Sequence, residues 1–99
     1  MADKDILEML KTDLQISTTK YDKYLTYVIK LAKAAIEKEG IVMNPVEKEG
    51  EVGLTIEDGM LVQMYAAYLY RKRREENAVM PRMLRYALNN RLLSQKGGS

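Results

Sequence analysis

The chain has 99 residues, of which 46% are hydrophobic and 30% charged, and its formal net charge is +2. This length predicts one domain, residues 1–96, because a chain of this size buries roughly two thirds of its unfolded surface in a single core. The absence of cysteine and histidine excludes disulfides and thiolate metal sites, and removes the commonest general base and transition-metal ligand. We therefore expect a protein that is not an enzyme and that uses no metal or cofactor.

Charge is distributed unevenly along the chain. Residues 1–50 carry a net charge of −1 and residues 51–99 carry +3, and all six arginines lie between positions 71 and 91. Arginine suits bidentate contacts with carboxylates or phosphates, and it stacks on aromatic rings. The surface that binds partners is therefore expected in the C-terminal third.

No segment predicts contact with a membrane. The longest uninterrupted apolar run covers residues 64–70, which is far short of the ~20 residues that span a bilayer. The first ten residues are charged and amphipathic rather than typical of a signal peptide. We expect the protein to begin in a cytoplasm.

Two helices are expected in the N-terminal half. The first covers residues 3–13, with Asp3 as its cap. The second begins with Thr19 as its N-cap and Asp22 three residues later, a variant of the capping box, and it ends at Gly40. Its apolar face predicts core packing, and that face consists of Tyr21, Tyr24, Leu25, Val28, Ile29, Leu31, Ala32, Ala35 and Ile36.

Residues 40–54 interrupt the helical pattern. They contain three glycines and the pair Asn44-Pro45 between short β-prone pieces. A flexible loop or a loose hairpin is the simpler interpretation. The alternative is a loop that reaches a neighbouring subunit, because long loops in small domains are often functional.

The third helix is expected to begin at Thr55, again with an acid, Asp58, three residues later. From residue 60 to residue 70 only Gln63 is polar. A helix that is apolar on nearly all sides lies at the centre of a domain or covers a second, intermolecular face. We favour the central position, in a small all-α domain of four helices.

This third helix ends in four consecutive cations, Arg71, Lys72, Arg73 and Arg74. A cation stabilises a helix C-terminus by ~0.3–1 kcal/mol at best, which accounts for one or two of them. A solvated helix end explains any single cation, but four exceed what capping requires.

The fourth helix is expected to begin with Pro81 at its first position. Its core-facing residues are expected to be Met83, Leu84, Ala87, Leu88 and Leu92. The opposite face has the mixed composition of an interface and consists of Arg82, Arg85, Tyr86, Asn89 and Leu93. Arg91 projects from the apolar stripe, so it either extends past the helix end or meets a partner. Residues 97–99 are expected to be a flexible tail, or a remnant of cloning.

Motifs for catalysis are absent from the sequence. No nucleotide-binding loop, nucleophile elbow or metal-ligand cluster occurs, and the paired acids at 47/49, 57/58 and 75/76 have polar neighbours. Seven tyrosines and seven methionines supply amphipathic and adaptable contact surface. Both biases favour assembly over catalysis.

Residues 64–73, MYAAYLYRKR, and residues 80–96, MPRMLRYALNNRLLSQK, resemble the phage head–tail connector family, the small helical head-completion adaptors of tailed bacteriophages. The N-terminal half is similar too, with ISTTKYD opening a long helix that ends in AKAAIEKEG. The resemblance covers nearly the whole chain apart from residues 40–54.

The resemblance implies an all-α viral adaptor that assembles as a homo-oligomeric ring, usually of twelve copies, under the portal protein after DNA packaging. Such a ring lies at the head–tail interface of the virion, extends the DNA channel and offers a platform to a tail-side or stopper protein. Before assembly the protein would be in the host cytoplasm. The C-terminal helical segment of the family engages the portal, which points to Arg82, Arg85, Tyr86, Asn89, Asn90 and Arg91.

By the same resemblance, Arg71, Lys72, Arg73 and Arg74 lie either at a subunit boundary or toward the DNA channel. The alternative hypothesis is a small basic helical module that binds nucleic acid through these cations and the face with Arg82 and Arg85, with steeply salt-dependent affinity. The acids at 75 and 76 and the lack of a known docking motif weigh against it. Under the adaptor hypothesis, charge reversal at Arg85 or Arg91 is expected to block portal attachment without unfolding the monomer.

Overall fold

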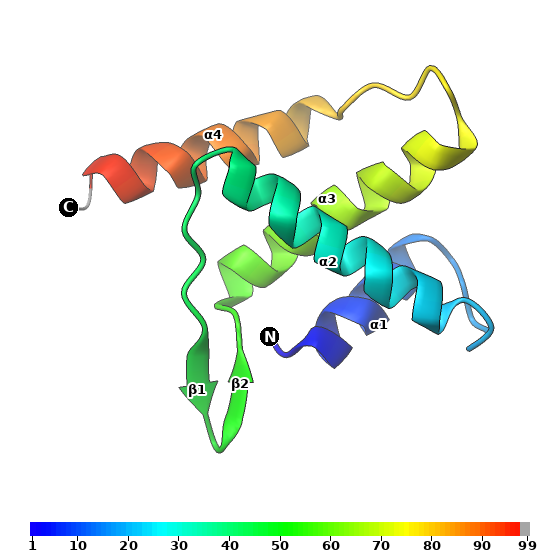
Figure 1. Cartoon of the computed structure of the whole chain (residues 1–99), viewed down its shortest axis with the longest axis horizontal. Helices are drawn as coiled ribbons and strands as arrows, with labels where there is room; N and C mark the ends of the chain where they lie inside the picture. The colour runs from blue at the N-terminus through cyan, green and yellow to red at the C-terminus, as the bar shows by residue number, and fades with distance from the viewer. Residues whose placement is uncertain (98–99) are drawn as a thin grey trace.

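The computed structural model describes residues 1–97, which form four helices and one two-stranded hairpin (Figure 1). In chain order the elements are α1 (Asp3–Asp13), α2 (Asp22–Lys38), β1 (Val46–Lys48), β2 (Glu51–Gly53), α3 (Ile56–Arg74) and α4 (Arg82–Gly97). The protein is mostly helical, and the hairpin within residues 40–54 corrects the expectation of an all-α domain. Of the expected tail, Gly97 ends α4, while residues 98–99 lie outside the described part of the chain.

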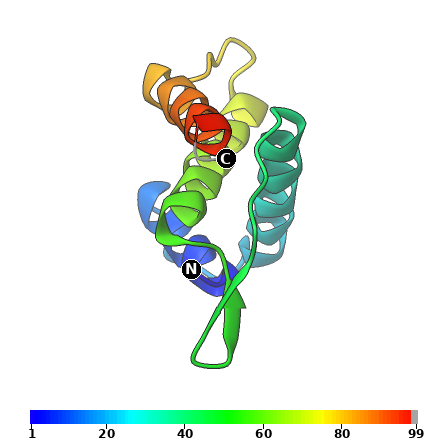
Figure 2. The same cartoon turned by 90° about the vertical axis from the view of Figure 1, so that its left-hand side faces the viewer.

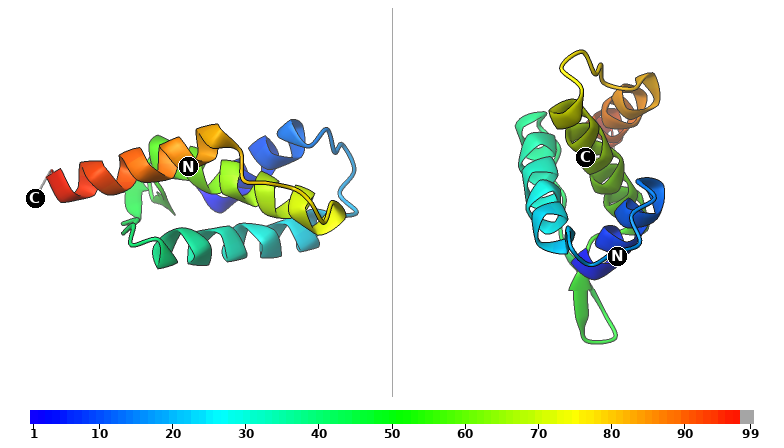
Figure 3. Two further views of the ribbon diagram at one scale, coloured as in Figure 1. Left: turned by 90° about the horizontal axis from the view of Figure 1, so that it is seen from above. Right: turned by 90° about the vertical axis from the view of Figure 1, so that its right-hand side faces the viewer.

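Helix α3 is the centre of the domain. It runs between α2 on one side and α1 and α4 on the other (Figure 3), and it contacts all three. This position explains why the helix is apolar on most sides. Its buried apolar residues are Leu61, Val62, Tyr65, Ala66 and Ala67. The expectation of a central third helix is confirmed.

The outer helices each contribute one face to the core. Their buried residues are Ile6 and Leu10 from α1, Leu25, Val28, Ile29, Ala32 and Ile36 from α2, and Leu84 and Leu88 from α4. The structure contradicts three core predictions, since Tyr21 and Leu31 are each 43% exposed and Met83 is 75% exposed. Tyr21 precedes its helix, and at 100° per residue Leu31 and Met83 lie about 120° from the centre of the buried stripe.

Two of the expected helix starts agree with the structure. The Thr55 hydroxyl accepts a hydrogen bond from the Asp58 backbone N–H at 3.1 Å, as expected of an N-cap. Pro81 lies one residue before α4, and its carbonyl accepts the first helical bond, from the Arg85 N–H at 3.1 Å. Pro81 therefore precedes the first helical position instead of occupying it, and α4 begins one residue later than expected.

Two other expected caps are wrong. Asp3 lies inside α1, whose N-cap is Ala2, and the Ala2 N–H donates to the Asp5 carboxylate at 3.0 Å. Tyr21, not Thr19, is the N-cap of α2, and it makes no side-chain capping bond. The Thr19 carbonyl instead accepts from the N–H of Asp22 at 3.1 Å in the preceding turn.

The hairpin projects from the helical body (Figure 2). Its strands are antiparallel, with Val46 opposite Gly53. Glu49 and Gly50 form the turn with φ of 53° and 78°, the positive values that a type I′ turn requires. The loose hairpin, one of the two simpler interpretations of residues 40–54, is confirmed.

The N-terminal backbone closes the base of the hairpin. The Met1 nitrogen donates to the Leu54 carbonyl, and the Leu54 N–H donates back to the Met1 carbonyl at 2.8 Å. A Cβ added at Gly53 would overlap the backbone of Met1 and Ala2. Position 53 therefore needs glycine because another chain segment passes directly over it.

We expect Gly53→Ala to lower the free energy of unfolding by about 1–3 kcal/mol, because backbone gives way to an inserted methyl group only with strain. Gly59→Ala is the comparison variant, since the three atoms nearest to its added methyl belong to the Met1 side chain, which shifts at a lower cost than backbone, and the helix gains ~1 kcal/mol of propensity. Urea unfolding of both variants measures the difference. Equal stability of Gly53→Ala and wild type would contradict the placement of Met1.

Candidate functional site

The residues expected to bind partners lie in two places. One group is on α4, and the other is at the C-terminal end of α3, near the start of α2 (Figure 1).

Arg91 of α4 has its partner inside the molecule. Its Nε donates to Asp58 Oδ1 at 2.7 Å, and its Nη2 donates to Asp58 Oδ2 at 3.3 Å and to the Val42 carbonyl at 2.8 Å. Asp58 is 3% exposed, and its hydrogen bonds raise the pKa of Arg91. This pair of the buried Asp58 with the partly buried Arg91 joins α4 to the first turn of α3 and to the segment that follows α2.

Gln95, one turn further along α4, fixes the same segment. Its side-chain amide donates to the Gly40 carbonyl at 2.9 Å, and its carbonyl accepts from the Val42 N–H at 2.7 Å. Arg91 and Gln95 together satisfy both polar groups of Val42. The second half of α4 is therefore held by hydrogen bonds, whereas its first half is held by the buried Leu84 and Leu88.

Arg85 also turns inward, toward the C-terminal end of α2. It makes two hydrogen bonds to the Glu39 carboxylate, at 3.0 and 3.2 Å. Through these bonds the guanidinium lowers the pKa of Glu39, and the carboxylate raises the pKa of Arg85. The pair is partly open to solvent, with side-chain exposures of 41% for Arg85 and 31% for Glu39.

The portal-interface candidates on α4 therefore divide into two sets. Arg85 and Arg91 are held in intramolecular pairs, whereas Arg82, Tyr86, Asn89 and Asn90 are exposed. Charge reversal at Arg91 would place a second carboxylate against Asp58. The structure thus gives no support to the expectation that such reversals leave the monomer intact.

The exposed side of α4 also carries large apolar side chains. Met83 is 75%, Tyr86 57% and Leu93 65% exposed. With Asn90, they follow one another at spacings of three, four and three residues, so they share one side of the helix. We call this set (Met83, Tyr86, Asn90 and Leu93) the α4 face.

The four cations at the end of α3 are exposed, and each has a partner in the chain. Arg71 lies 3.5 Å from the Asp13 carboxylate, and Lys72 Nζ lies 5.8 Å from the ring centroid of Tyr68. Arg73 and Arg74 lie over tyrosine rings, which is the geometry of cation–π attraction.

Arg73 and Arg74 border a cavity of about 450 Å³ whose other lining residues are Tyr21, Tyr24 and Tyr70. We call these five residues the Tyr–Arg notch. The Arg73 guanidinium lies 5.0 Å from the Tyr24 ring centroid and donates to its hydroxyl at 3.1 Å. Arg74 donates to the Tyr70 hydroxyl, also at 3.1 Å. No acidic side chain lines the notch, so the notch suits a carboxylate or a phosphate.

The sequence did not predict the tyrosines of this notch. Helical periodicity predicts Tyr21 and Tyr24 on the core face of α2, and Tyr70 is only the last residue of the apolar run 64–70. The notch forms because side chains from the start of α2 and the end of α3 pack together, with the Tyr24 and Tyr70 ring centroids 6.3 Å apart. Periodicity within one helix carries no signal for that meeting.

Within residues 1–97, no three acidic side chains are grouped so that they would hold a metal ion. The helices of the same range are all too short or too polar to cross a membrane.

We expect Arg91→Ala to lower the free energy of unfolding by about 3–5 kcal/mol, because it leaves Asp58 buried without its partner. The double variant Asp58→Ala/Arg91→Ala is expected to be more stable than Arg91→Ala, since it removes both charges. Arg82→Ala, at an exposed cation of the same helix, should change stability by no more than about 0.5 kcal/mol. Additive losses in a urea-unfolding cycle would contradict this coupling.

The Arg85–Glu39 pair predicts a specific pH dependence. The pKa of Glu39 is lower in the folded protein than in the unfolded chain, so the unfolded chain binds more protons between the two values, and stability falls as pH falls there. We expect Glu39→Gln to be less stable than wild type by ~1 kcal/mol or less above about pH 5, since partly exposed pairs are screened. Below about pH 4.3 the difference should shrink. Urea titrations at several pH values measure this difference, and a stability difference between Glu39→Gln and wild type that grows as pH falls would contradict the prediction.

The chain matches no family model, no curated protein and no solved structure.

Proposed function

We propose that this chain is a non-enzymatic structural adaptor. In this proposal it forms a ring beneath the portal of a tailed phage, extends the DNA channel and provides the platform for tail attachment. It is a component of the virion at the head–tail interface and occupies the host cytoplasm before assembly. Its partners are further copies of itself, the portal protein and a tail-side protein.

The observation that carries the proposal is the α4 face. The helix already buries Leu84 and Leu88 against the core, so the α4 face is a second apolar stripe on the other side of the same helix. A helix with an apolar side that its own domain leaves uncovered is a common means of docking into a groove of another protein. The residues of this helix also carry the strongest part of the sequence resemblance.

The six portal-interface candidates on α4 have two different roles in this proposal. Arg82, Tyr86, Asn89 and Asn90 are exposed and are assigned to direct contact with the portal. Arg85 and Arg91 are assigned to positioning, because their bonds to Glu39 and Asp58 fix the rotation of α4 about its axis. That rotation decides which residues α4 presents to a partner.

A basic module that binds nucleic acid is the second candidate function. Its supporting observation is that Arg71, Lys72, Arg73 and Arg74 are all exposed at one end of α3. Phosphate contacts by such a group are independent of base sequence and weaken steeply with salt. A channel wall in the adaptor would show the same behaviour, so DNA binding alone does not separate the two functions.

The test is co-sedimentation with the portal ring encoded by the same genome, at low salt and at ~0.5 M salt, where exposed charge pairs are screened. We expect wild type to bind stoichiometrically at both, because the α4 face binds through apolar contacts. Tyr86→Ala/Leu93→Ala should weaken binding roughly tenfold or more, as expected for central apolar anchors. Tyr27→Ala is the matched control, since Tyr27 is also 57% exposed but belongs to α2.

Unchanged binding of Tyr86→Ala/Leu93→Ala would remove the α4 face from the portal contact. Failure of wild type to bind the portal, together with DNA retention that collapses at ~0.5 M salt, would instead favour the nucleic-acid module.

A further inference from the structure

We infer that the hairpin of one copy, residues 46–53, docks on the Tyr–Arg notch of the next copy. This inference rests on the ring-forming function proposed above and names the two surfaces that would meet between neighbours. It identifies the occupant of the notch as a second copy of this chain.

The hairpin has the composition of a ligand for a basic, aromatic site. It contains three glutamates, Glu47, Glu49 and Glu51, and one lysine, so its net charge is −2. All three glutamates are exposed, and Val46 and Val52 are 44% and 62% exposed. Away from its base at Leu54, the hairpin projects from the helical body (Figure 2). Glu51 lies 3.5 Å from Lys4 Nζ in an exposed ion pair, and the other acidic and apolar side chains are open to another molecule.

The notch has the complementary composition. Arg73 and Arg74 each donate one hydrogen bond to a tyrosine hydroxyl, and a guanidinium has five N–H donors. Donors therefore remain for the carboxylates of a partner. The rings of Tyr21, Tyr24 and Tyr70 line the same cavity and offer apolar surface to valine side chains. Charge and apolar character both match the hairpin.

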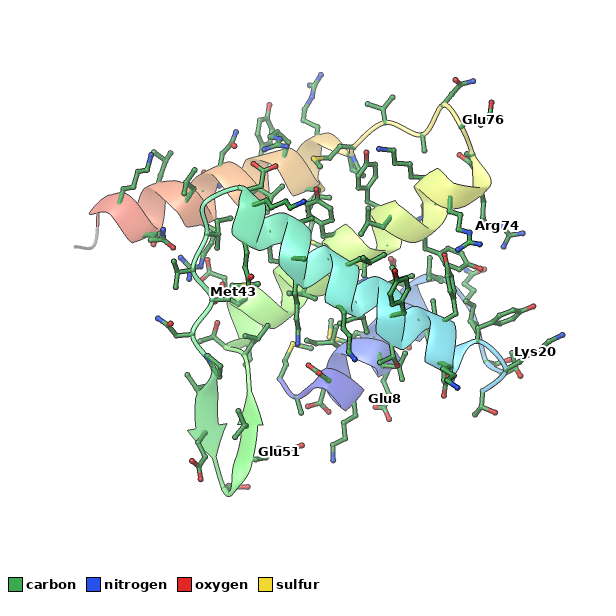
Figure 4. The ribbon with its side chains drawn as sticks, viewed as in Figure 1. Glu8, Lys20, Met43, Glu51, Arg74 and Glu76 are labelled. Atoms are coloured by element: carbon green, nitrogen blue, oxygen red, sulfur yellow. The ribbon has the colours of Figure 1, made fainter. Side chains whose placement is uncertain are left out.

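The two surfaces lie at separate edges of the molecule. Figure 4 shows Glu51 on the hairpin at the lower edge, and Arg74 and Lys20 at the right-hand edge. The domain measures 41 × 38 × 18 Å, a thin plate with the two surfaces at separate places on its outline. One copy therefore does not satisfy its own notch. A contact between two different surfaces propagates from copy to copy, and it closes into a ring when the rotation allows.

The expected contact is weak for one pair of copies and sensitive to salt. Exposed ion pairs contribute little individually and are screened at high ionic strength. Repetition around a closed ring raises the total strength, because each later contact is made within an assembly. This salt response differs from that expected of the α4 face, so the two contacts are separable by experiment.

The test exchanges charges between the two surfaces. The notch variant is Arg73→Glu/Arg74→Glu, and the hairpin variant is Glu47→Lys/Glu49→Lys. Each variant alone presents like charges at both surfaces, whereas an equimolar mixture presents opposite charges at every contact. Sedimentation velocity at low salt, up to ~1 mM protein, measures self-association in the range of weak contacts.

We expect wild type to self-associate and each variant to do so at least roughly tenfold more weakly, because like charges oppose the contact. The mixture should recover association. Lys30→Glu/Lys38→Glu and Glu8→Lys/Glu37→Lys make the same charge changes at exposed residues of α2 and α1 and should behave as wild type. Helical circular dichroism confirms folding, and Arg73→Gln/Arg74→Gln replaces the notch variant if reversal unfolds it.

Three results would overturn the inference. They are a wild type that stays monomeric at ~1 mM, association that neither variant weakens, and a mixture that does not recover association. If the notch variant loses DNA retention but keeps self-association, the occupant of the notch is a phosphate backbone. None of these measurements uses the portal, so their failure is distinct from failure of the adaptor proposal.

Discussion

The ion pair between Arg91 and the buried Asp58 fixes the rotation of α4 about its axis, and so which side of the helix faces outward. Asp58 lies in the first turn of α3, where the helix dipole favours a negative charge, and it is too buried to be solvated. Arg91 compensates that charge and also binds the Val42 carbonyl. Three segments distant in sequence therefore meet at one guanidinium. The outward direction of the α4 face follows from this contact.

The three outer helices could be predicted from the sequence because each has an apolar stripe that α3 covers, and α3 could be predicted to be central because it is apolar on most sides. Helical periodicity gave wrong core predictions at the edges of these stripes, as for Met83, because it does not determine how much of a helix the neighbouring helix covers. The sequence pattern also predicts Asp58 as the acid of a capping box, whereas in the structure its carboxylate binds Arg91. The partner of Arg91 and the meeting of Tyr24 with Tyr70 depend on tertiary packing. Neither has a local signal in the chain.

The two proposed contacts, one through the α4 face and one between the hairpin and the Tyr–Arg notch, differ in physical character. The α4 face relies on apolar side chains, whose burial is favourable across a wide range of ionic strength. The hairpin and the Tyr–Arg notch rely on charge, which salt screens. A protein with both kinds of surface can respond to solution conditions at one contact and not at the other. The mixture of tyrosine, methionine and arginine in the C-terminal third fits this division.

The brevity of the hairpin has a mechanical consequence. Two strands of three residues each contribute little stability of their own, and the Met1–Leu54 pairing anchors only their base. Such an arm fixes where a neighbouring subunit attaches, but it does not fix the angle between the two subunits. A neighbour held at its tip can tilt while the four helices keep their arrangement. The curvature of a ring built in this way would come from the template on which it assembles rather than from the shape of a single subunit.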